Sequence, residues 1–434
     1  MFMLIMNYTY RIYPSKEQEA IMLSWLETCR RLYNRCLRDL KDWINSRKCS
    51  IDSCSLEKEY VISPDIAFPN YLEQKRQLTQ WKKTNSYLKQ VYSQTTQDVV
   101  KRMHNTWEAF KRRGYGFPRY RKFGQYRSFY YPQFKESPLT PQNLGGTKGG
   151  ICSIKLPKIG DIVINQHRPI PFGFNVKGVR VVSRARNTLW YVVVTIQRNV
   201  DVPDVMPHGR AIGVDIGLEN FLTTSDGLEV KPARFFRDLQ SRLKELQRKA
   251  SRKQKRSKNY HKAQIKVALL HHKIANTRKN FHFQTAHQLC NQAQMIFVED
   301  IDFTKTAKAM LGKHMLDGGF GQFRQLLKWV GWKRDVYVAE VDHRYTSQIC
   351  PNCQAHTGKK NLSIRVHVCP ECGYSTTRDI ASAQIIKQRG EASIEVPMDG
   401  GERKLSAECV LSGVLYLDKC NAETSQRELR SIAL

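Results

Sequence analysis

The chain has 434 residues, of which 41% are hydrophobic, so we expect two or three domains with buried cores. Its 71 lysines and arginines outnumber its 39 aspartates and glutamates, which leaves a net charge of +32 and favours a nucleic-acid partner over a basic protein that binds no polyanion. The longest apolar run, Leu189–Ile196, is far shorter than the roughly 20 residues of a membrane helix. The first residues lack the charged region of a secretory signal, so we expect neither a membrane protein nor a secreted one.

The first half of the chain predicts a small β-barrel or curled sheet with helices inserted into it. A strand is expected at Tyr8–Tyr13, and the basic and aromatic pattern that begins just after Met6 suggests Met6 as the start codon. Ser15 and Gln18 form a candidate capping box. Apolar residues at helical spacing predict one helix after it and a second over Leu88–Phe110, with a loop at Ser46–Asn70 between them. Four later strands are expected at Ile151–Leu156, Ile162–Asn165, Val179–Ser183 and Trp190–Gln197.

The second half predicts an α/β arrangement instead. The strands are expected at Ala211–Asp215, Met295–Val298 and Val336–Val341. The helices are expected over Phe235–Ala293 with a break near 257–259, over Phe320–Lys333 and over Arg378–Arg389. We therefore predict an α+β multidomain protein. Its parts are a β-barrel domain at residues 1–205 with its helical part at about 15–125, an α/β domain at 206–390, and a mobile tail at 391–434.

Four of the twelve cysteines form two closely spaced pairs. Cys350 and Cys353 make one C-x-x-C motif, and Cys369 and Cys372 make the other. Two such motifs can supply the four thiolates of a closed tetrahedral zinc site, which would be structural because no coordination position stays open. A redox dithiol and a pair of disulfides are the competing interpretations. We expect the zinc-binding segment at about residues 346–376.

Three carboxylates occupy positions where catalytic residues are expected. Asp215 ends one predicted strand, Glu299 ends another, and Asp379 opens a helix. Strand ends in an α/β sheet face a common crevice, and three converging carboxylates can bind a pair of Mg²⁺ ions for phosphodiester hydrolysis. Taken singly, each residue also fits a turn, a solvated strand end or a helix cap. Asp300, Asp302 and Glu340 are the other acidic candidates.

Several of these segments resemble the TnpB/OrfB proteins of insertion-sequence elements. IGVDIGLENFLTTSDG resembles the first RuvC motif of that family, and QMIFVEDIDF resembles the second. TSQICPNC, followed by LSIRVHVCPECGYSTTRDIASAQII, resembles the zinc ribbon that leads into the third motif. The opening YRIYPSKEQEAIMLSWLETCRRLYN and the segment LPKIGDIVINQHRPIP are also similar to family segments, so the resemblance covers about residues 7–390.

The resemblance implies an RNA-guided DNA endonuclease related to compact type V CRISPR effectors. Its RuvC/RNase H-like domain would be interrupted by the zinc ribbon, and Asp215, Glu299 and Asp379 would form its catalytic triad. Its cofactors would be one structural Zn²⁺ ion and two catalytic Mg²⁺ ions. Its partners would be a guide RNA from the transposon end, target double-stranded DNA cut beside a short adjacent motif, and a separate tyrosine transposase of the same element. The expected location is the prokaryotic cytoplasm, on the nucleoid when DNA is bound.

The third motif departs from the family pattern, because Ala381 and Ser382 stand where the family commonly has Asn and Ala. Two other functions stay open beside the endonuclease. One is a DDE-type transposase that joins strands, and the other is a catalytically weak RNA-guided regulator that only binds DNA. A plain zinc-ribbon RNA-binding protein would leave the three carboxylates unexplained.

Two segments are candidates for nucleic-acid binding. The helical stretch after Phe235 is dense in bases, and residues 115–131 interleave aromatic and basic side chains. In the first, cations can follow phosphates; in the second, rings can stack on unpaired bases. The alternatives are a solvated charged helix face and rings that belong to a core. The residues predicted to bind are Arg248, Lys249, Arg252, Lys253 and Arg256 in the first segment, and Arg119, Arg121 and Lys122 in the second.

Overall fold

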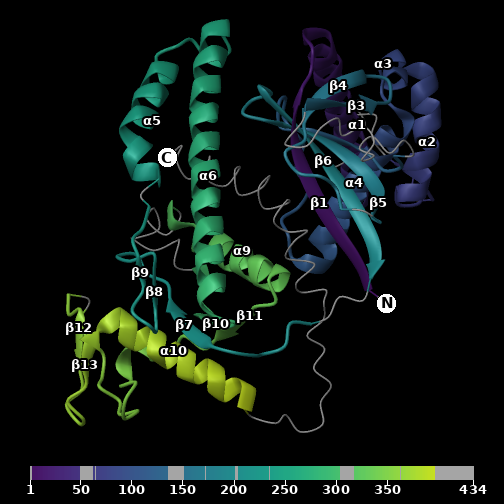
Figure 1. Cartoon of the computed structure of the whole chain (residues 1–434). Coiled ribbons are helices and arrows are strands. Elements are labelled where there is room, and N and C mark those ends of the chain that lie inside the picture. The colour runs from purple at the N-terminus through teal and green to yellow at the C-terminus, as the bar shows by residue number, and fades with distance from the viewer. Residues whose placement is uncertain are drawn as a thin grey trace. The chain divides into compact units, whose positions relative to one another are not determined.

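The computed structural model describes residues 2–48, 62–63, 65–134, 151–171, 173–200, 204–233, 235–303, 317–361 and 363–395. The chain divides into two compact units, Met1–Asp201 and Val202–Leu434 (Figure 1). Within the described residues, no helix combines the length and the apolar character that crossing a membrane requires.

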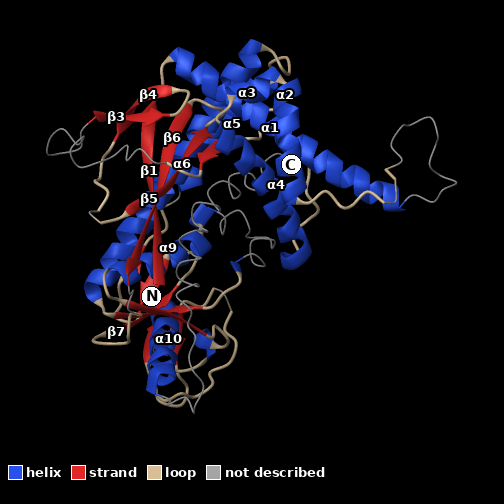
Figure 2. Cartoon of the chain, turned by 90° about the vertical axis from the view of Figure 1, so that its right-hand side faces the viewer, coloured by secondary structure: helices blue, strands red, loops and turns tan. Residues whose placement is uncertain are grey.

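The first unit is built on a six-stranded sheet in the order β2-β5-β6-β1-β4-β3 (Figure 2). The strands are β1 (Phe2–Tyr13), β2 (Ser128–Tyr131), β3 (Ile151–Leu156), β4 (Gly160–Asn165), β5 (Asn175–Arg184) and β6 (Leu189–Val200). The central pair β1 and β6 is antiparallel from Phe2 opposite Val200 to Ile12 opposite Trp190. The strand expected to begin at Tyr8 therefore begins at Phe2, and the four later strands occur where they were expected.

The sheet is an open half-barrel, so of the two expected forms the curled sheet is confirmed and the β-barrel is not. Among the described strands, no pairing joins β2 to β3 at the two edges. Helices cover the apolar face instead. The ring of Trp25 lies 5.4 Å from that of Phe129 on β2, and both side chains share a core with Ile154 on β3. Because helical side chains fill the concave face, the strands have no need to close on themselves to bury it.

The helices of this unit are α1 (Lys16–Lys48), α2 (Tyr71–Thr84), α3 (Ser86–Gln90) and α4 (Ser93–Arg113). The capping box is confirmed: Ser15 N donates to Gln18 Oε1 at 3.0 Å, and Gln18 N donates to Ser15 Oγ at 3.2 Å. The helix expected over Leu88–Phe110 is confirmed from Ser93 onward as α4, but its first residues are not part of it, because Val91 is extended and separates α3 from α4. Helix α2 had not been predicted.

The second unit is built on a five-stranded sheet in the order β11-β10-β7-β8-β9. Its strands are β7 (Ala211–Asp215), β8 (Leu222–Thr224), β9 (Glu229–Val230), β10 (Met295–Glu299) and β11 (Tyr337–Val341). Strand β10 runs parallel to β7 and β11, whereas β7, β8 and β9 form antiparallel hairpins. The strands predicted in this half of the chain are confirmed.

Helices cover both faces of this sheet (Figure 1). The helices are α5 (Phe235–Ser251), α6 (Lys258–Gln292), α9 (Phe320–Lys333) and α10 (Arg378–Glu395). Val214 and Val298 pack on one face with residues of α6 and α9, and Phe297 packs on the other with Ile386 of α10. A short 3-10 helix η3 (Thr346–Gln348) and the hairpin β12 (Val366–Val368) and β13 (Ser375–Thr377) lie between β11 and α10.

Helix α10 runs to Glu395, six residues past its predicted end at Arg389. The first residues of the expected tail are therefore helical. The rest of that tail, from 396 onward, lies outside the described residues. The break expected near 257–259 in the long basic helix is confirmed, because α6 begins at Lys258 with Ser257 as its cap.

Candidate active site and metal centre

Asp215 and Glu299 lie side by side at the ends of two neighbouring parallel strands. Val214 of β7 stands opposite Val298 of β10, so the next residue of each strand is Asp215 or Glu299. Side chains alternate along a strand, so both carboxylates face the same side as Phe297, which is the side that α10 covers. Asp379 lies in the first turn of α10. The fold thus brings the three predicted carboxylates to one edge of the sheet.

Helix α10 approaches β7 closely because Gly213 has no side chain. A Cβ at Gly213 would lie 2.0 Å from the carbonyl oxygen of Ala383 and 2.5 Å from the amide nitrogen of Lys387. The backbone of the helix therefore rests directly on the strand that ends in Asp215. The unusual residues of the third motif, Ala381 and Ser382, are both buried in this helix.

The pKa of each of the three carboxylates is raised above its usual range, in every case mainly by burial. Burial raises the pKa of Asp215 well above its usual range, and the charges of Glu299 and Asp379 raise it further. Burial also raises the pKa of Glu299 and of Asp379. Buried carboxylates are hard oxygen donors whose charge is unfavourable by itself, and a divalent cation such as Mg²⁺ can neutralise such a set. Their oxygens do not all lie within 4.8 Å of one another, a spacing that only the four cysteines meet among the described residues.

Glu299 has a hydrogen-bond partner that was missed in the sequence. Thr346 Oγ1 donates to Glu299 Oε1 at 2.7 Å, and both residues are 6% exposed. Thr346 lies in η3, between β11 and the first cysteine pair. A threonine five residues after the end of a strand has no spacing that would single it out, so only the fold reveals this contact.

The other acidic candidates lie elsewhere. Glu340 stands opposite Val298, which puts its side chain on the α9 face of the sheet. There it forms ion pairs with Arg324 at 3.0 Å and with Lys328 at 2.8 Å. The side chain of Asp300 is 66% exposed and lies 3.5 Å from Arg324. Asp302 is also exposed. The site therefore consists of Asp215, Glu299 and Asp379 without these three.

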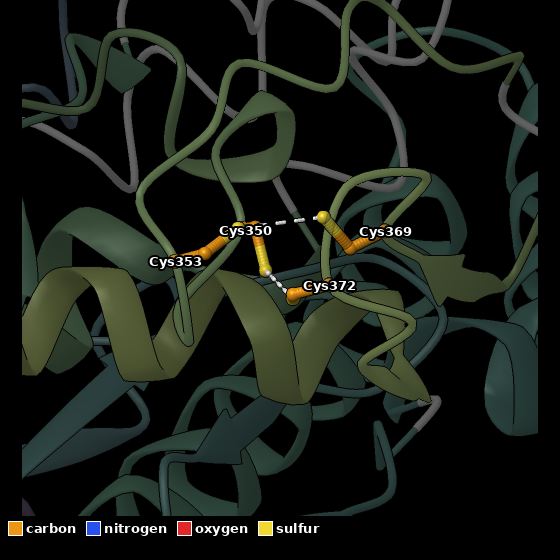
Figure 3. Close-up of side chains that lie close together, drawn as sticks. All are labelled: Cys350, Cys353, Cys369 and Cys372. Atoms are coloured by element: carbon orange, nitrogen blue, oxygen red, sulfur yellow. Dashed lines mark hydrogen bonds between the residues drawn. The ribbon is translucent and has the colours of Figure 1, made fainter.

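The four cysteines of the two C-x-x-C motifs meet at one point (Figure 3). Cys350 Sγ lies 3.7 Å from Cys372 Sγ, and Cys353 Sγ lies 3.5 Å from Cys369 Sγ. Zinc–sulfur bonds of about 2.3 Å in a tetrahedron separate the sulfurs by about 3.8 Å, whereas a disulfide requires about 2.05 Å. The sulfur spacing therefore fits a bound zinc ion and does not fit a disulfide.

Each cysteine pair is shaped by a tight backbone turn. Cys350 N donates to Ala355 O, and Cys369 N donates to Tyr374 O, both at 2.9 Å. Gly373 has a φ of +71°, which a glycine adopts without strain. The two histidines of this segment are not ligands of the cluster. His367 is fully buried.

The predicted basic residues of the second unit lie at the tip of a helical hairpin. Helices α5 and α6 pack through Leu243, Val267 and Leu270. Arg248 and Lys249 lie in the last turns of α5, and Lys249 forms an ion pair with Glu245. The others follow in the connecting turn. All five predicted side chains are exposed: Arg248, Lys249, Arg252, Lys253 and Arg256.

The aromatic and basic segment divides into an exposed part and a core part. Phe123 is 81% exposed, whereas Phe129 and Tyr131 are fully buried. Arg119 and Lys122 are exposed, but Arg121 is partly buried with its guanidinium 5.6 Å from the ring centre of Tyr33. The core interpretation is therefore confirmed for the buried part of the segment, and nucleic-acid binding by its exposed part stays a prediction.

Comparison with known proteins agrees with these observations. Residues 191–310 match the OrfB_IS605 family, described as "Probable transposase", and residues 320–386 match the "Cas12f1-like, TNB domain". Residues 1–49 match the "Helix-turn-helix domain" of OrfB_IS605 proteins, although the described residues 2–48 form one strand, β1, and one helix, α1. The chain therefore contains OrfB_IS605 (TnpB) family domains and resembles the proteins of that family.

Relatives of this family align over most of their length. The "Putative RNA-guided DNA endonuclease InsQ" of Escherichia coli (strain K12) is 28% identical over 89% of this chain and 92% of its own. A "Putative RNA-guided DNA endonuclease" of Streptomyces pristinaespiralis is 27% identical over 89% of both chains. The solved "Cas12f1-sgRNA-target DNA complex" covers 89% of this chain at 12% identity, with a TM-score of 0.33 that carries no conclusion.

Proposed function

We propose that the protein is an RNA-guided DNA endonuclease of a transposable element. The proposal is supported by Asp215 and Glu299 ending two neighbouring strands of the five-stranded sheet, and by the charges of Glu299 and Asp379 acting on Asp215. The order of strand, hairpin, helix, strand and helix follows the RuvC/RNase H-like plan. The two bacterial relatives, both named as putative RNA-guided DNA endonucleases, support the same activity.

The three carboxylates would hold catalytic Mg²⁺, for which we propose two ions. When bound, the ions supply an activated water and stabilise the leaving oxygen of the DNA phosphodiester. All three carboxylates would hold the ions, with Asp215, whose charge interacts with those of Glu299 and Asp379, as the proposed shared ligand. Burial of Glu299 and its bond to Thr346 keep that carboxylate in one orientation. The proposed products carry a 5′-phosphate and a 3′-hydroxyl.

The remaining partners follow from the chemistry of the surfaces. Cys350, Cys353, Cys369 and Cys372 would hold a structural zinc ion. The exposed cations at the tip of α5 and α6 and those near Phe123 would contact guide RNA or target DNA through phosphates. A separate tyrosine enzyme would carry out strand transfer for the element, and this protein would act in the cytoplasm, on the nucleoid.

The test is guide-dependent plasmid cleavage. The chain is co-expressed with the RNA transcribed from the flanking DNA and purified as a complex. The complex is then offered a guide-matched plasmid that carries a randomised adjacent motif, with Mg²⁺ or with EDTA. Cutting that requires both the guide and Mg²⁺, and that enriches one motif, is the expected result. Binding without cutting would favour the regulator, and joined strands would favour a transposase.

A further inference from the structure

The residue that contacts Glu299 belongs to a segment held from two sides. Thr346 Oγ1 lies 2.7 Å from Glu299 Oε1 and 3.3 Å from the carbonyl oxygen of His343. A hydroxyl has one proton to donate, and the shorter bond to a charged acceptor is the stronger of the two. The hydroxyl of Thr346 therefore points at the carboxylate, in a place where neither group reaches solvent.

Helix α10 holds this segment through hydrogen bonds to its backbone carbonyls. One nitrogen of the Arg389 guanidinium donates to the carbonyl oxygens of Asp342 and Arg344, both at 2.7 Å. These two carbonyls immediately precede η3 in the chain. Gln388, the neighbouring residue of α10, donates to the carbonyl oxygen of Pro351 at 2.7 Å, just beyond η3. The helix that carries Asp379 thus fixes both ends of the segment that carries Thr346.

The turn that follows the first cysteine pair holds the other end of η3. Thr357 donates to the carbonyl oxygen of Gln348, the last residue of η3, from its backbone N at 2.7 Å and from its hydroxyl at 3.1 Å. Ile349 and His356 form a β-bridge across the same turn. Thr346 is therefore joined through a few fixed hydrogen bonds both to α10 and to the turn that contains Cys350 and Cys353.

We propose that Thr346 is a positioning residue that orients the Glu299 carboxylate for metal binding. The inference rests on the proposed function, because it assigns Glu299 as a ligand of the catalytic metal. A carboxylate fixed by a buried donor presents one oxygen in a set direction, whereas a carboxylate without that donor can rotate. Partners of this kind commonly change metal affinity or activity by about 10–100-fold when they are removed.

The test compares Thr346→Val, Thr346→Ser and a control, Thr277→Val, in the full-length guide-RNA complex. Valine keeps the shape of threonine and removes the donor, and serine keeps the donor. Thr277 is an exposed residue of α6 in the same unit, so its replacement leaves the site untouched. Three properties are measured: the melting temperature, the binding of guide-matched DNA in EDTA, and the binding of Mn²⁺ by electron paramagnetic resonance.

We expect Thr346→Val to melt and to bind matched DNA like the wild type, and to bind Mn²⁺ at the carboxylates about 10–100-fold more weakly. The Mg²⁺ concentration for half-maximal cutting should rise in parallel. Thr346→Ser should restore both properties, and Thr277→Val should change neither. Wild-type Mn²⁺ affinity in Thr346→Val would overturn the inference, as would an equal loss in Thr346→Ser. If the wild-type complex bound Mn²⁺ but did not cut DNA, the proposed function would fail, while the Mn²⁺ comparison would still decide the role of Thr346.

Discussion

Replacing Gly213 by alanine should separate α10 from the strand that carries Asp215. The added Cβ would lie 2.0 Å from the carbonyl oxygen of Ala383 and 2.5 Å from the amide nitrogen of Lys387. Both are backbone atoms of one helical turn, so no side-chain rotation relieves the overlap. Ordinary contacts begin at 3.4 Å. The helix must therefore withdraw by about 1.4 Å, the difference between 3.4 and 2.0 Å.

This displacement has consequences for both stability and cutting. Overpacking of a well-packed core costs about 1–3 kcal/mol, which for a unit of this size lowers the melting temperature by about 2–12 °C. Asp379 moves with α10, whereas Asp215 stays with the sheet. A misplacement of about 1 Å in a catalytic group can reduce the rate about 100-fold, so cutting should fall by at least that factor.

The measurement pairs thermal unfolding with single-turnover cleavage of a guide-matched plasmid. Gly321→Ala is the matched control, because Gly321 lies in α9 of the same unit and a Cβ there meets nothing closer than 3.9 Å. We expect the control to melt and to cut like the wild type. Unchanged melting and cutting in Gly213→Ala would refute the close packing of α10 on β7. Reduced melting with a normal cutting rate would refute the role of that packing in placing Asp379.

Three further predictions concern the charges and the metal sites. Because the pKa values of Asp215, Glu299 and Asp379 are raised in the fold, the metal-free folded protein holds protons that the unfolded chain releases above a pH of about 4. The cluster therefore destabilises the fold increasingly as pH rises from about 4 toward those raised pKa values. In EDTA, the melting temperature of Asp215→Asn should exceed that of the wild type by an amount that grows with pH. A difference that stays constant with pH would contradict the shared burial of the carboxylates. The purified protein should contain about one zinc ion per chain by elemental analysis, and Cys353→Ala should lose it, whereas a zinc content unchanged by that substitution would exclude the cluster as its site. Replacing Arg252 and Lys253 by glutamine should reduce the slope of log affinity against log salt by about 1 for each phosphate that these cations neutralise, and an unaltered slope would show that the tip of α5 and α6 does not bind nucleic acid.

The parts of the fold that follow from local patterns could be predicted from the sequence. Apolar runs predicted the strands that end at Asp215 and Glu299, because a buried strand consists of consecutive apolar residues. The four-cysteine cluster could also be predicted, because two C-x-x-C motifs at this spacing are typical of a zinc site.

The parts that depend on distant contacts could not be predicted. The extended conformation at Val91, which interrupts the helix expected over Leu88–Phe110, has no Gly or Pro to mark it. The sheet of the first unit stays open because Trp25, far away in the chain, covers Phe129. The hydrogen bond between Thr346 and Glu299 joins residues 47 positions apart, and no periodic pattern records such a pairing.

The most direct test of the proposed site is cutting by Asp215→Ala in the purified guide-RNA complex, beside the wild type, with Mg²⁺ and a guide-matched plasmid. The account predicts that the variant binds matched DNA as tightly as the wild type does and cuts it at no detectable rate, because Asp215 interacts with the charges of the other two carboxylates and would help to hold the metal ions. Cutting by Asp215→Ala at the wild-type rate would contradict the assignment of the catalytic carboxylates.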